Sequence, residues 1–456
     1  MLQRISVIGL GKLGASMAAG FASRGFDVIG VDVSQRAVDA LNNGLAPVEE
    51  TDLASTIAAH RERLRATLSH EEAVLSSDIS FVIVPTPSDE RGSFSLQYAA
   101  YAFRELGKAL AKKRDYHVIV LTSTVLPGSV RYGLLPILEA ESGKKCGPDF
   151  GLCYNPEFIA LGSVIRDFLN PDFYLVGQFD RRSGDVLEAV HQRVSANKSP
   201  TQRMSLENAE LAKIAVNSFV TMKISFANLL AGICENIPGG DVDVVSDAMG
   251  MDSRIGRKYL TGGFGFGGPC FPRDNVALAF LGNAVGASCE LLEANDRFNR
   301  SLAGAIVDKL RSRIPQGGNV AVLGLAYKPH SHVVEQSPGI HLAKTLSDSG
   351  YRVLGHDPLA AENATAALMG HGLVTNDLAV CLQQADTFLI TTRDPAYGCL
   401  QAADFLVNGK ERATVVDFWR FLPHLETEAR IQYLPLGRCL DDEAAAERLQ
   451  KLWTSR

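Results

Sequence analysis

The sequence predicts an α/β protein in which two doubly wound parallel-sheet domains are joined by a long central helix and a helical middle domain. Three observations predict this class. Residues 5–14 read as a buried strand, a glycine turn and a helix start, a similar pattern returns at residues 320–325, and residues 205–236 follow one long helical repeat. A strand and a helix that alternate along the chain are typical of parallel sheets covered by helices.

The first glycine turn predicts a dinucleotide site. The motif GLGKLG at residues 9–14 follows the strand at 5–8 and opens a helix of small residues. Glycines there allow a tight turn and let a pyrophosphate approach the helix N-terminus, where N–H groups and the helix dipole favour anions. The next strand, 28–31, ends at Asp32. A carboxylate at that position can accept both ribose hydroxyls and repels a 2′-phosphate, so the pattern favours NAD over NADP.

Further strands place polar residues at the same edge of the predicted sheet. We interpret residues 46–77 as a charged helical region and assign it no chemistry. The strands at 81–84 and 118–121 end in PTP and TST, and the strand at 150–154 is followed at once by Asn155-Pro156-Glu157. Open parallel sheets bind ligands beyond the carboxyl ends of their strands, so these segments are expected to line one crevice. Glu157 also fits an acid near a helix N-terminus.

The long helix expected over 205–236 carries one polar stripe along a mostly apolar surface. The stripe consists of Glu210, Lys213, Asn217, Thr221, Ser225 and Asn228. These residues recur at steps of three and four, so they share one helix face. One interpretation is a solvent-exposed face. Most of the stripe is neutral, however, whereas solvated faces carry many charges, and we therefore favour a stripe that lines a site.

The strongest local signal is GGFGFGGPCFPRD at residues 262–274. Five glycines in seven residues leave the backbone free to lie against a ligand, and they end at Cys270. Pro272 and Asp274 suit the first turn of a helix. Cys270 is then expected at the positive end of the helix dipole with Arg273 nearby, an environment that favours the nucleophilic thiolate. The alternative is a structural cysteine in a glycine-rich turn.

The C-terminal part repeats the first pattern. Helical turns are expected at 242–249 and 250–259 and a helix at 291–310, before the linker PQGG at 315–318. Residues 320–325 then echo 5–10, and 350–357 echo 25–32. The second turn, GLAYKP at 324–329, lacks the later glycines, so we expect it not to bind a dinucleotide in the same way. Strands are expected at 387–391 and 414–416, and a charged amphipathic helix at 441–456.

Composition excludes several classes of protein. A chain of 456 residues is long enough for two or three domains. Its net charge of −6, with scattered basic residues, argues against a nucleic-acid partner. The eight cysteines show no metal-ligand spacing and no disulfide framework. We find no signal-peptide pattern and no apolar run of membrane-spanning length. We therefore expect a cytoplasmic protein without a metal or a membrane partner.

Taken in order, these motifs resemble the UDP-glucose/GDP-mannose dehydrogenase family. The resemblance rests on the glycine turn, Thr124, NPEF at 155–158, Lys213 with Asn217, GMDSRIG at 250–256 and FGFGGPCFPRD at 264–274. It implies an NAD-binding Rossmann domain at 1–200, a central helical dimerisation domain at 201–300 and a Rossmann-like sugar-nucleotide-binding domain at 301–456. It also implies an NAD-dependent oxidoreductase that oxidises the C6 alcohol of a nucleotide sugar, most plausibly UDP-glucose, to the carboxylate.

The resemblance assigns chemical roles residue by residue. Cys270 is expected to attack the C6 aldehyde and form a thioester, Lys213 and Asn217 to stabilise the oxyanion, Glu157 and Asp274 to transfer protons, and Thr124 to position water. The expected NAD contacts are Gly9, Gly11, Lys12, Leu13, Gly14, Asp32, Pro85, Thr86, Thr124 and Arg273. The expected substrate contacts are Glu157, Phe158, Lys213, Asn217, Arg254, Phe264, Gly265, Phe266, Gly267 and Lys328. Arg254 is expected to reach the neighbouring site of a homodimer.

Five positions depart from the family pattern. Pro269 and Arg273 replace a serine and a lysine around the cysteine, and Leu161 replaces an acid. Glu335 and Phe173 each stand where an arginine is usual. A GDP-mannose or other NDP-hexose 6-dehydrogenase is therefore the second hypothesis. Two further alternatives are a two-electron dehydrogenase of the 6-phosphogluconate type, which has no use for Cys270, and a non-catalytic NAD-binding protein.

Overall fold

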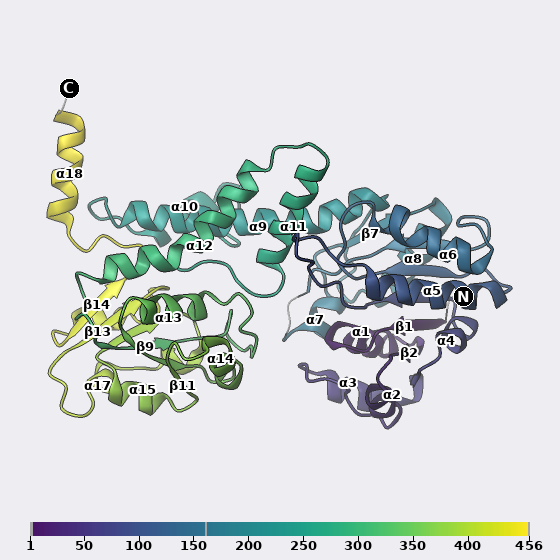
Figure 1. Cartoon of the computed structure of the whole chain (residues 1–456), viewed down its shortest axis with the longest axis horizontal. Helices are drawn as coiled ribbons and strands as arrows, with labels where there is room; N and C mark the ends of the chain where they lie inside the picture. Colours follow the sequence, from purple (N-terminus) through teal and green to yellow (C-terminus); the bar gives the residue numbers. More distant parts are fainter. Residues whose placement is uncertain (1–2, 160–161, 455–456) are drawn as a thin grey trace. The chain divides into compact units, whose positions relative to one another are not determined.

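The computed structural model describes residues 3–159 and 162–454 (Figure 1). Leu161 lies outside these ranges. The chain divides into two compact units, each described here by itself: Met1–Val216 with Phe280–Ala287, and Asn217–Ala279 with Ser288–Arg456. The expected domain boundaries at residues 200 and 300 stay predictions.

The first unit is built on an eight-stranded sheet in the order β3-β2-β1-β4-β5-β6-β7-β8. Its strands are β1 Arg4–Ile8, β2 Asp27–Val31, β3 Leu64–Thr67, β4 Ile79–Val82, β5 Val118–Leu121, β6 Gly151–Tyr154, β7 Tyr174–Gln178 and β8 Thr201–Ser205. Neighbouring strands are parallel except β6 and β7. The first six strands follow the 3-2-1-4-5-6 order of doubly wound folds, as the sequence predicts.

Helices cover both faces of this sheet. They are α1 Lys12–Ser23, α2 Gln35–Asn42, α3 Leu53–Ala59, α4 His70–Ser76, α5 Gln97–Lys112, α6 Leu135–Ser142, α7 Val164–Leu169 and α8 Arg181–Val194. Strand residues alternate between two cores: Val7 and Phe81 pack with α1, α7 and α8, whereas Ile8 and Val82 pack with α4, α5 and α6. The central strands are buried on both faces, which explains their continuous apolar runs.

One regional prediction in this unit is wrong. Residues 46–77 are not continuously helical, because Leu64–Thr67 forms edge strand β3 between α3 and α4. Leu64 and Ala66 are buried and Arg65 is exposed, the alternation of a half-buried strand. Strands β7 and β8 were also not predicted from the sequence.

Four long helical elements follow. They are α9 Leu206–Cys234, α10 Val242–Gly250, α11 Phe271–Ala284 and α12 Glu290–Leu310, as the sequence predicts, but residues 251–259 form turns instead of helix. Contrary to expectation, α9 is long and apolar enough to cross a membrane by length and composition, with a mean hydropathy of 1.4 over 18 residues. Core helices of soluble proteins meet the same criterion, so length and composition alone do not identify α9 as a membrane span. The expected cytoplasmic location stays a prediction.

The second unit contains a six-stranded parallel sheet in the order β11-β10-β9-β12-β13-β14. Its strands are β9 Asn319–Leu323, β10 Arg352–His356, β11 Leu373–Thr375, β12 Thr387–Ile390, β13 Ala413–Asp417 and β14 Ile431–Pro435. Its helices are α13 Pro338–Asp348, α14 Ala361–Leu368, α15 Leu378–Gln384, α16 Pro395–Gly398, α17 Ala402–Phe405 and α18 Asp442–Thr454. The order is again 3-2-1-4-5-6, which confirms the predicted second doubly wound domain.

A buried polar chain crosses the middle of the first sheet. Ser6 on β1 contacts the hydroxyl of Ser80 on β4 at 2.5 Å, and Ser77 donates to Ser6 at 3.0 Å. His117 closes the chain, with Nε2 2.8 Å from the Ser80 hydroxyl and Nδ1 3.2 Å from the Ser77 carbonyl. Burial, with a smaller contribution from the charge of Lys113, lowers the pKa of His117 to about 3.

We predict that His117 makes the protein less stable in acid. Its imidazole is neutral in the fold but titrates near pH 6.5 when unfolded, so stability is full above pH 6.5 and falls as the pH drops toward 3. Between pH 7.5 and 5.0 the loss from this group is about 2 kcal/mol. Urea unfolding of wild type and His117→Gln at both pH values measures it. An equal acid loss in both proteins would contradict the prediction.

Candidate functional site

The three glycines of the first turn have three different surroundings. Gly9 has a φ of +100°, and a Cβ there would lie 2.2 Å from the Ile83 carbonyl oxygen. A Cβ on Gly14 would lie 1.9 Å from the Gly9 carbonyl oxygen, so this glycine is needed for close packing of helix on strand. A Cβ on Gly11 would meet nothing within 4 Å. The backbone at Gly11, at the N-terminus of α1, is therefore open toward a ligand, which fits a pyrophosphate.

Asp32 organises the same turn. Its Oδ2 accepts a hydrogen bond from the Leu10 N–H at 2.7 Å, and its Oδ1 accepts one from the Ser34 N–H at 2.8 Å. The side chain remains half-buried and keeps acceptor capacity for ribose hydroxyls. Lys12 and Leu13 form the first turn of α1, both half-buried, as the dinucleotide prediction requires.

The turn of the second sheet is closed by its own residues. A Cβ on Gly324 would lie 2.4 Å from the Thr392 hydroxyl. Asp357, the counterpart of Asp32, is 4% exposed and accepts four backbone N–H groups. These donors are Leu325, Ala326, Leu359 and Ala360. Its acceptor sites are filled, which adds a second reason, besides the absent glycines, to expect that this turn does not bind a dinucleotide in the same way as the first.

Two strand ends of the first unit are tied together. The Thr86 hydroxyl donates to the Thr124 carbonyl at 2.8 Å. The Ser123 hydroxyl donates to the Val84 carbonyl at 2.6 Å and accepts from the Val84 N–H at 3.0 Å. Pro85 lies between Val84 and Thr86 in the sequence and is exposed. The predicted cofactor residues after β4 and β5 therefore do lie side by side.

Glu157 lies at the carboxyl end of β6, on a loop held by a buried amide. Asn155 donates to the Leu175 carbonyl at 3.1 Å, and its Oδ1 lies 3.0 Å from Nε2 of His191. Glu157 Oε1 is buried without a hydrogen-bond partner among the described residues. Burial raises the pKa of Glu157 to about 8, and the positive charge of Lys213 opposes that shift. A carboxyl group of this kind can accept or release a proton near neutral pH.

Lys213 on α9 meets the same loop. Its Nζ donates to the Glu157 carbonyl at 2.6 Å and lies 4.4 Å from the centre of the Phe158 ring. Lys213 is 7% exposed. The structure thus brings together Lys213, Glu157 and Phe158, three residues that the sequence assigned to one site.

Cys270 lies directly ahead of α11, as the sequence predicts. Its side chain is exposed, and its carbonyl accepts the Asp274 N–H at 2.8 Å. Asp274 is 1% exposed, and its Oδ2 accepts from the Asn217 amide at 2.7 Å. Arg273 Nε lies 3.5 Å from Asp274 Oδ1. Thiol, carboxylate, amide and guanidinium are therefore gathered around one helix N-terminus.

The glycine-rich segment before Cys270, residues 262–268 and hereafter the glycine loop, packs tightly against its own protein. A Cβ on Gly263 would lie 2.6 Å from the Trp419 ring, and one on Gly265 would lie 2.4 Å from Asn299 Oδ1. A Cβ on Gly267 would lie 2.3 Å from the Gln336 carbonyl oxygen, and one on Gly268 would lie 2.5 Å from the Tyr327 ring. Internal packing therefore requires these glycines whether or not a ligand is bound.

Arg420 anchors the start of the glycine loop. It is 7% exposed and forms a bidentate ion pair with Asp243 at 2.7 and 2.9 Å. It also donates to the Gly262 carbonyl at 2.6 Å and to the carbonyls of Phe418 and Leu436 at 2.9 and 2.7 Å. A buried guanidinium with all of its donors used is well satisfied, so it fixes α10 and the glycine loop on the second sheet.

Tyr327 and Lys328 follow β9 beside the same loop. The Tyr327 ring packs under Gly268, and burial, with a smaller contribution from Cys270, raises the pKa of Tyr327 to about 12. The phenol therefore stays a hydrogen-bond donor at neutral pH. Lys328 Nζ lies 5.6 Å from the Tyr327 ring centre.

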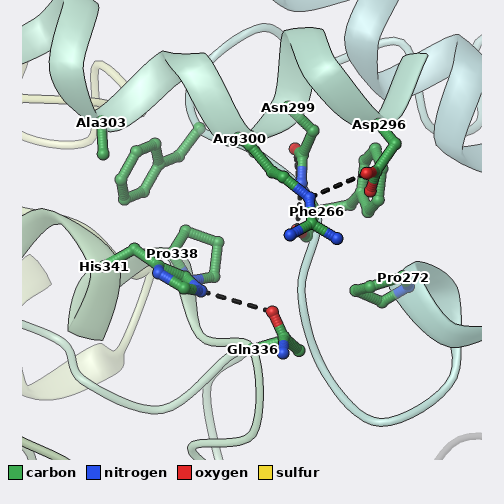
Figure 2. Close-up of a pocket in the computed structure, with 11 residues that line it drawn as sticks. Phe266, Pro272, Asp296, Asn299, Arg300, Ala303, Gln336, Pro338 and His341 are labelled. Atoms are coloured by element: carbon green, nitrogen blue, oxygen red, sulfur yellow. Dashed lines mark hydrogen bonds and ion pairs between the residues drawn. The ribbon is translucent and has the colours of Figure 1, made fainter. Parts of the chain in front are cut away.

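A cavity of about 270 Å³ lies between the glycine loop, α12 and α13 (Figure 2). Phe264 and Phe266 contribute apolar walls, and Asp296, Arg300 and His341 contribute polar ones. A separate apolar groove of about 580 Å³ runs along α9, α10 and α12 and includes Arg254. The Arg254 side chain is 86% exposed and pairs with Asp252 at 2.6 Å.

Sequence reasoning missed Asn299, Arg420 and Tyr327. Their partners in the glycine loop lie 33 or more residues away along the chain, and no local motif marks them. Asn228 was recognised only as one member of the polar stripe. A buried polar residue on an otherwise apolar helix was the one available signal, and it was correct for α9: Glu210, Thr221 and Asn228 are 0%, 0% and 7% exposed.

Models of one family match three parts of the chain. The NAD binding domain of the UDP-glucose/GDP-mannose dehydrogenase family matches residues 3–195, its central domain 207–301 and its UDP binding domain 321–424. UDP-glucose 6-dehydrogenase AglM of Haloferax volcanii is 39% identical over 363 residues, covering 79% of this chain and 84% of that protein. GDP-mannose 6-dehydrogenase of Pseudomonas aeruginosa is 32% identical over 440 residues, covering 93% and 98%.

A solved structure gives the same result. The UDP-glucose dehydrogenase from Pyrobaculum islandicum is 33% identical, covers 96% of this chain and 98% of its own, and matches with a TM-score of 0.85. Together with the glycine turn and Asp32, these matches establish the cofactor as NAD. The chain therefore belongs to the UDP-glucose/GDP-mannose dehydrogenase family and is an NAD-dependent nucleotide-sugar dehydrogenase.

Proposed function

We propose that this protein oxidises the C6 alcohol of UDP-glucose to the carboxylate in two successive steps, through a thioester on Cys270. The observation that carries the proposal is the exposed Cys270 directly ahead of α11, with Asp274 buried in the first turn of that helix and hydrogen-bonded to Asn217 of α9. Hydride transfer from an alcohol to NAD⁺ does not need a nucleophile. An accessible thiol at a helix N-terminus instead fits the oxidation of an aldehyde to an acid through a covalent thioester.

Bound NAD⁺ supplies the hydride acceptor for each of the two oxidations, which together remove four electrons from the sugar. The open backbone at Gly11 receives the pyrophosphate and the Asp32 carboxylate receives the ribose hydroxyls. Gly9 and Gly14 hold the turn closed, and Lys12 and Leu13 present the first N–H groups of α1. We assign the remaining contacts to Pro85, Thr86, Thr124 and Arg273.

The residues of the chain divide the chemistry between them. Glu157 or Asp274 takes the C6 hydroxyl proton as the first hydride leaves, which gives the aldehyde. The Cys270 thiolate then bonds to C6, and the ammonium of Lys213 and the amide of Asn217 stabilise the oxyanion. Loss of the second hydride gives the thioester. Water positioned by Thr124 attacks it, the carbon–sulfur bond breaks, and the acid and the thiol are released.

We propose UDP-glucose as the substrate in preference to GDP-mannose on the basis of sequence identity to related enzymes. The UDP-glucose 6-dehydrogenase of Haloferax volcanii has the higher sequence identity, whereas the GDP-mannose enzymes match more of the chain at lower identity. GDP-mannose is therefore the second candidate. Phe158, Phe264, Gly265, Phe266, Gly267 and Lys328 are proposed as further substrate contacts.

We also propose a homodimer formed through α9. Apolar side chains on this helix are exposed, among them Phe219 at 64% and Phe226 at 46%, and the groove beside them is apolar. Arg254 belongs to that groove, and we assign to its exposed side chain, now paired with Asp252, a contact with the site of a second copy. In this assignment residues 1–200 bind NAD, 201–300 dimerise and 301–456 bind the sugar nucleotide.

The stoichiometry of NADH tests the covalent step. Wild type is expected to release two NADH per UDP-glucose and fewer, or none, per GDP-mannose. Cys270→Ala removes the thioester and is expected to lose the second NADH, with turnover lowered by about 100-fold or more. Cys399→Ala is the matched control, because Cys399 is exposed like Cys270. Two NADH from Cys270→Ala would rule the proposal out.

The pH dependence tests Glu157. Since its pKa is raised to about 8 by burial and it acts as a base when deprotonated, kcat/KM is expected to rise through pH 8 and fall on acidification. Glu157→Gln is expected to abolish this limb and to lower kcat/KM by about 10²–10⁴-fold. Rates measured from pH 6 to 9 at saturating NAD⁺ give the comparison. An unchanged limb in the Gln variant would assign the titration to another group.

The glycine turn offers a test that separates binding from folding. Gly11→Ala adds a Cβ that touches nothing in the protein, so its Tm is expected to match wild type while its Kd for NAD⁺ rises by about tenfold or more. Gly14→Ala is expected to lower Tm, because its Cβ clashes with the Gly9 carbonyl. Gly304→Ala, also without close neighbours, is the control. An unchanged NAD⁺ affinity in Gly11→Ala would contradict this placement.

A further inference from the structure

Two asparagine side chains hold the backbone of the glycine loop. Asn299 on α12 accepts the Phe266 N–H at 2.9 Å and donates to the Phe266 carbonyl at 2.9 Å. Asn228 on α9 accepts the Gly263 N–H at 2.8 Å and donates to the Phe264 carbonyl at 2.9 Å. Figure 2 shows Asn299 extending from α12 to Phe266. Each amide uses both of its polar groups on the loop, so it fixes orientation as well as position.

Asn299 and Gly265 depend on each other. A Cβ on residue 265 would lie 2.4 Å from Asn299 Oδ1, so the two hydrogen bonds to Phe266 form only if residue 265 has no side chain. The Phe266 ring is 4% exposed, so it adds packing to the two hydrogen bonds. The loop is therefore bonded and packed at a point four residues before Cys270.

The surroundings of Asn299 give a released loop room to move. Asp296 and Arg300, its neighbours on α12, pair with each other at 2.8 Å, and within residues 3–159 and 162–454 neither side chain hydrogen-bonds the glycine loop. Both residues border the cavity of about 270 Å³, which the loop itself walls through Phe264, Gly265 and Phe266. Without the amide, the two hydrogen bonds from α12 to Phe266 are lost, and apolar packing such as that of Leu302 beside Gly265 remains.

We propose that Asn299 is a positioning residue, which holds the glycine loop in the one conformation that presents Cys270 correctly for attack. The proposal rests on the proposed role of Cys270. Asn299 makes no contact of its own with the reacting atoms, since both of its polar groups are used on Phe266. Attack on an aldehyde needs the reacting atoms aligned, and a misplacement of about 1 Å costs on the order of 100-fold in rate.

The test compares Asn299→Ala and Asn299→Asp with Arg300→Gln. The Asp variant has the same shape but loses the donor to the Phe266 carbonyl. Arg300 is the adjacent residue and borders the same cavity without bonding the loop, so it is the matched control. Both Asn299 variants are expected to lower kcat about 10- to 100-fold, with Kd for NAD⁺ within about twofold of wild type. Arg300→Gln is expected to stay within about twofold in both.

A second measurement, the alkylation rate of Cys270, does not depend on catalytic turnover. The rate at which iodoacetamide alkylates Cys270 reports how the thiol is presented, and it is expected to change at least about threefold in the Asn299 variants but not in Arg300→Gln. A lower Tm with unchanged kcat and unchanged alkylation would mean a purely structural role and would overturn the proposal. If Cys270→Ala still yields two NADH, the proposed function fails instead, whatever the Asn299 variants show.

A double-mutant cycle on Asn299 and Gly265 provides an independent test. Gly265→Ala is expected to lower kcat as Asn299→Ala does, because the new Cβ displaces the amide. In the double variant the clash is absent, so it is expected to be no slower than Asn299→Ala alone. Independent, multiplied losses in the double variant would overturn the claim that the two residues act as one support. This cycle also remains informative if Asn299→Asp proves poorly folded.

Discussion

Buried polar side chains need hydrogen-bond partners, and polar side chains along most of helix α9 have them. Five of the six residues in its polar stripe are hydrogen-bonded, namely Glu210, Lys213, Asn217, Thr221 and Asn228, whereas the buried hydroxyl of Ser225 has no hydrogen-bond partner among the described residues. The partners are the N–H groups of Gly128 and Val130, the carbonyl of Glu157, the carboxylate of Asp274, the amide of Asn295, and the backbone of Gly263 and Phe264. One helix therefore holds the backbone or side chains of five other segments.

The cost of losing a partner explains why this arrangement specifies loop positions. A buried group left without its hydrogen bond costs about 1–3 kcal/mol, which is large against the total stability of a domain. Glu210 shows the balance: burial raises its pKa to about 7, while the Gly128 and Val130 N–H groups oppose that shift. The carboxylate is retained because it satisfies two N–H groups where the segment after Thr124 turns into a helix. Loops that carry chemistry are thus fixed by a scaffold instead of by their own stiffness.

A structural feature could be predicted from the sequence where the residues that determine it lie close together in the chain. The first strand, the glycine turn, α1 and Asp32 lie within 32 residues and were predicted correctly, because each rule acts over a few positions. The start of α11 after Cys270 was predicted for the same reason. Edge strand β3 was misread as helix, because Leu64–Thr67 is too short to show its alternation among charged neighbours. Asn299 could not be found, because its partner Phe266 is 33 residues away and only the fold brings them together.

Glycine itself illustrates the limit of a motif. Gly11 and Gly265 look alike in sequence, but a Cβ on the first meets open space and a Cβ on the second meets Asn299. The first glycine leaves room for a ligand and the second leaves room for the protein. The motif alone cannot separate these causes, since both require the missing side chain. Only the surroundings in the fold do.

This distinction changes what the glycine loop contributes to a site. Along residues 262–268 burial alternates, as in an extended strand, with Phe264 and Phe266 turned inward. The N–H groups of Gly263, Phe266 and Gly268 are used within the protein, by Asn228, Asn299 and the Glu335 carbonyl. Because the supports are internal, the loop keeps its shape before any ligand arrives. Preorganisation of this kind lowers the entropic cost of binding, so in the proposed substrate site the loop would serve as a rigid wall.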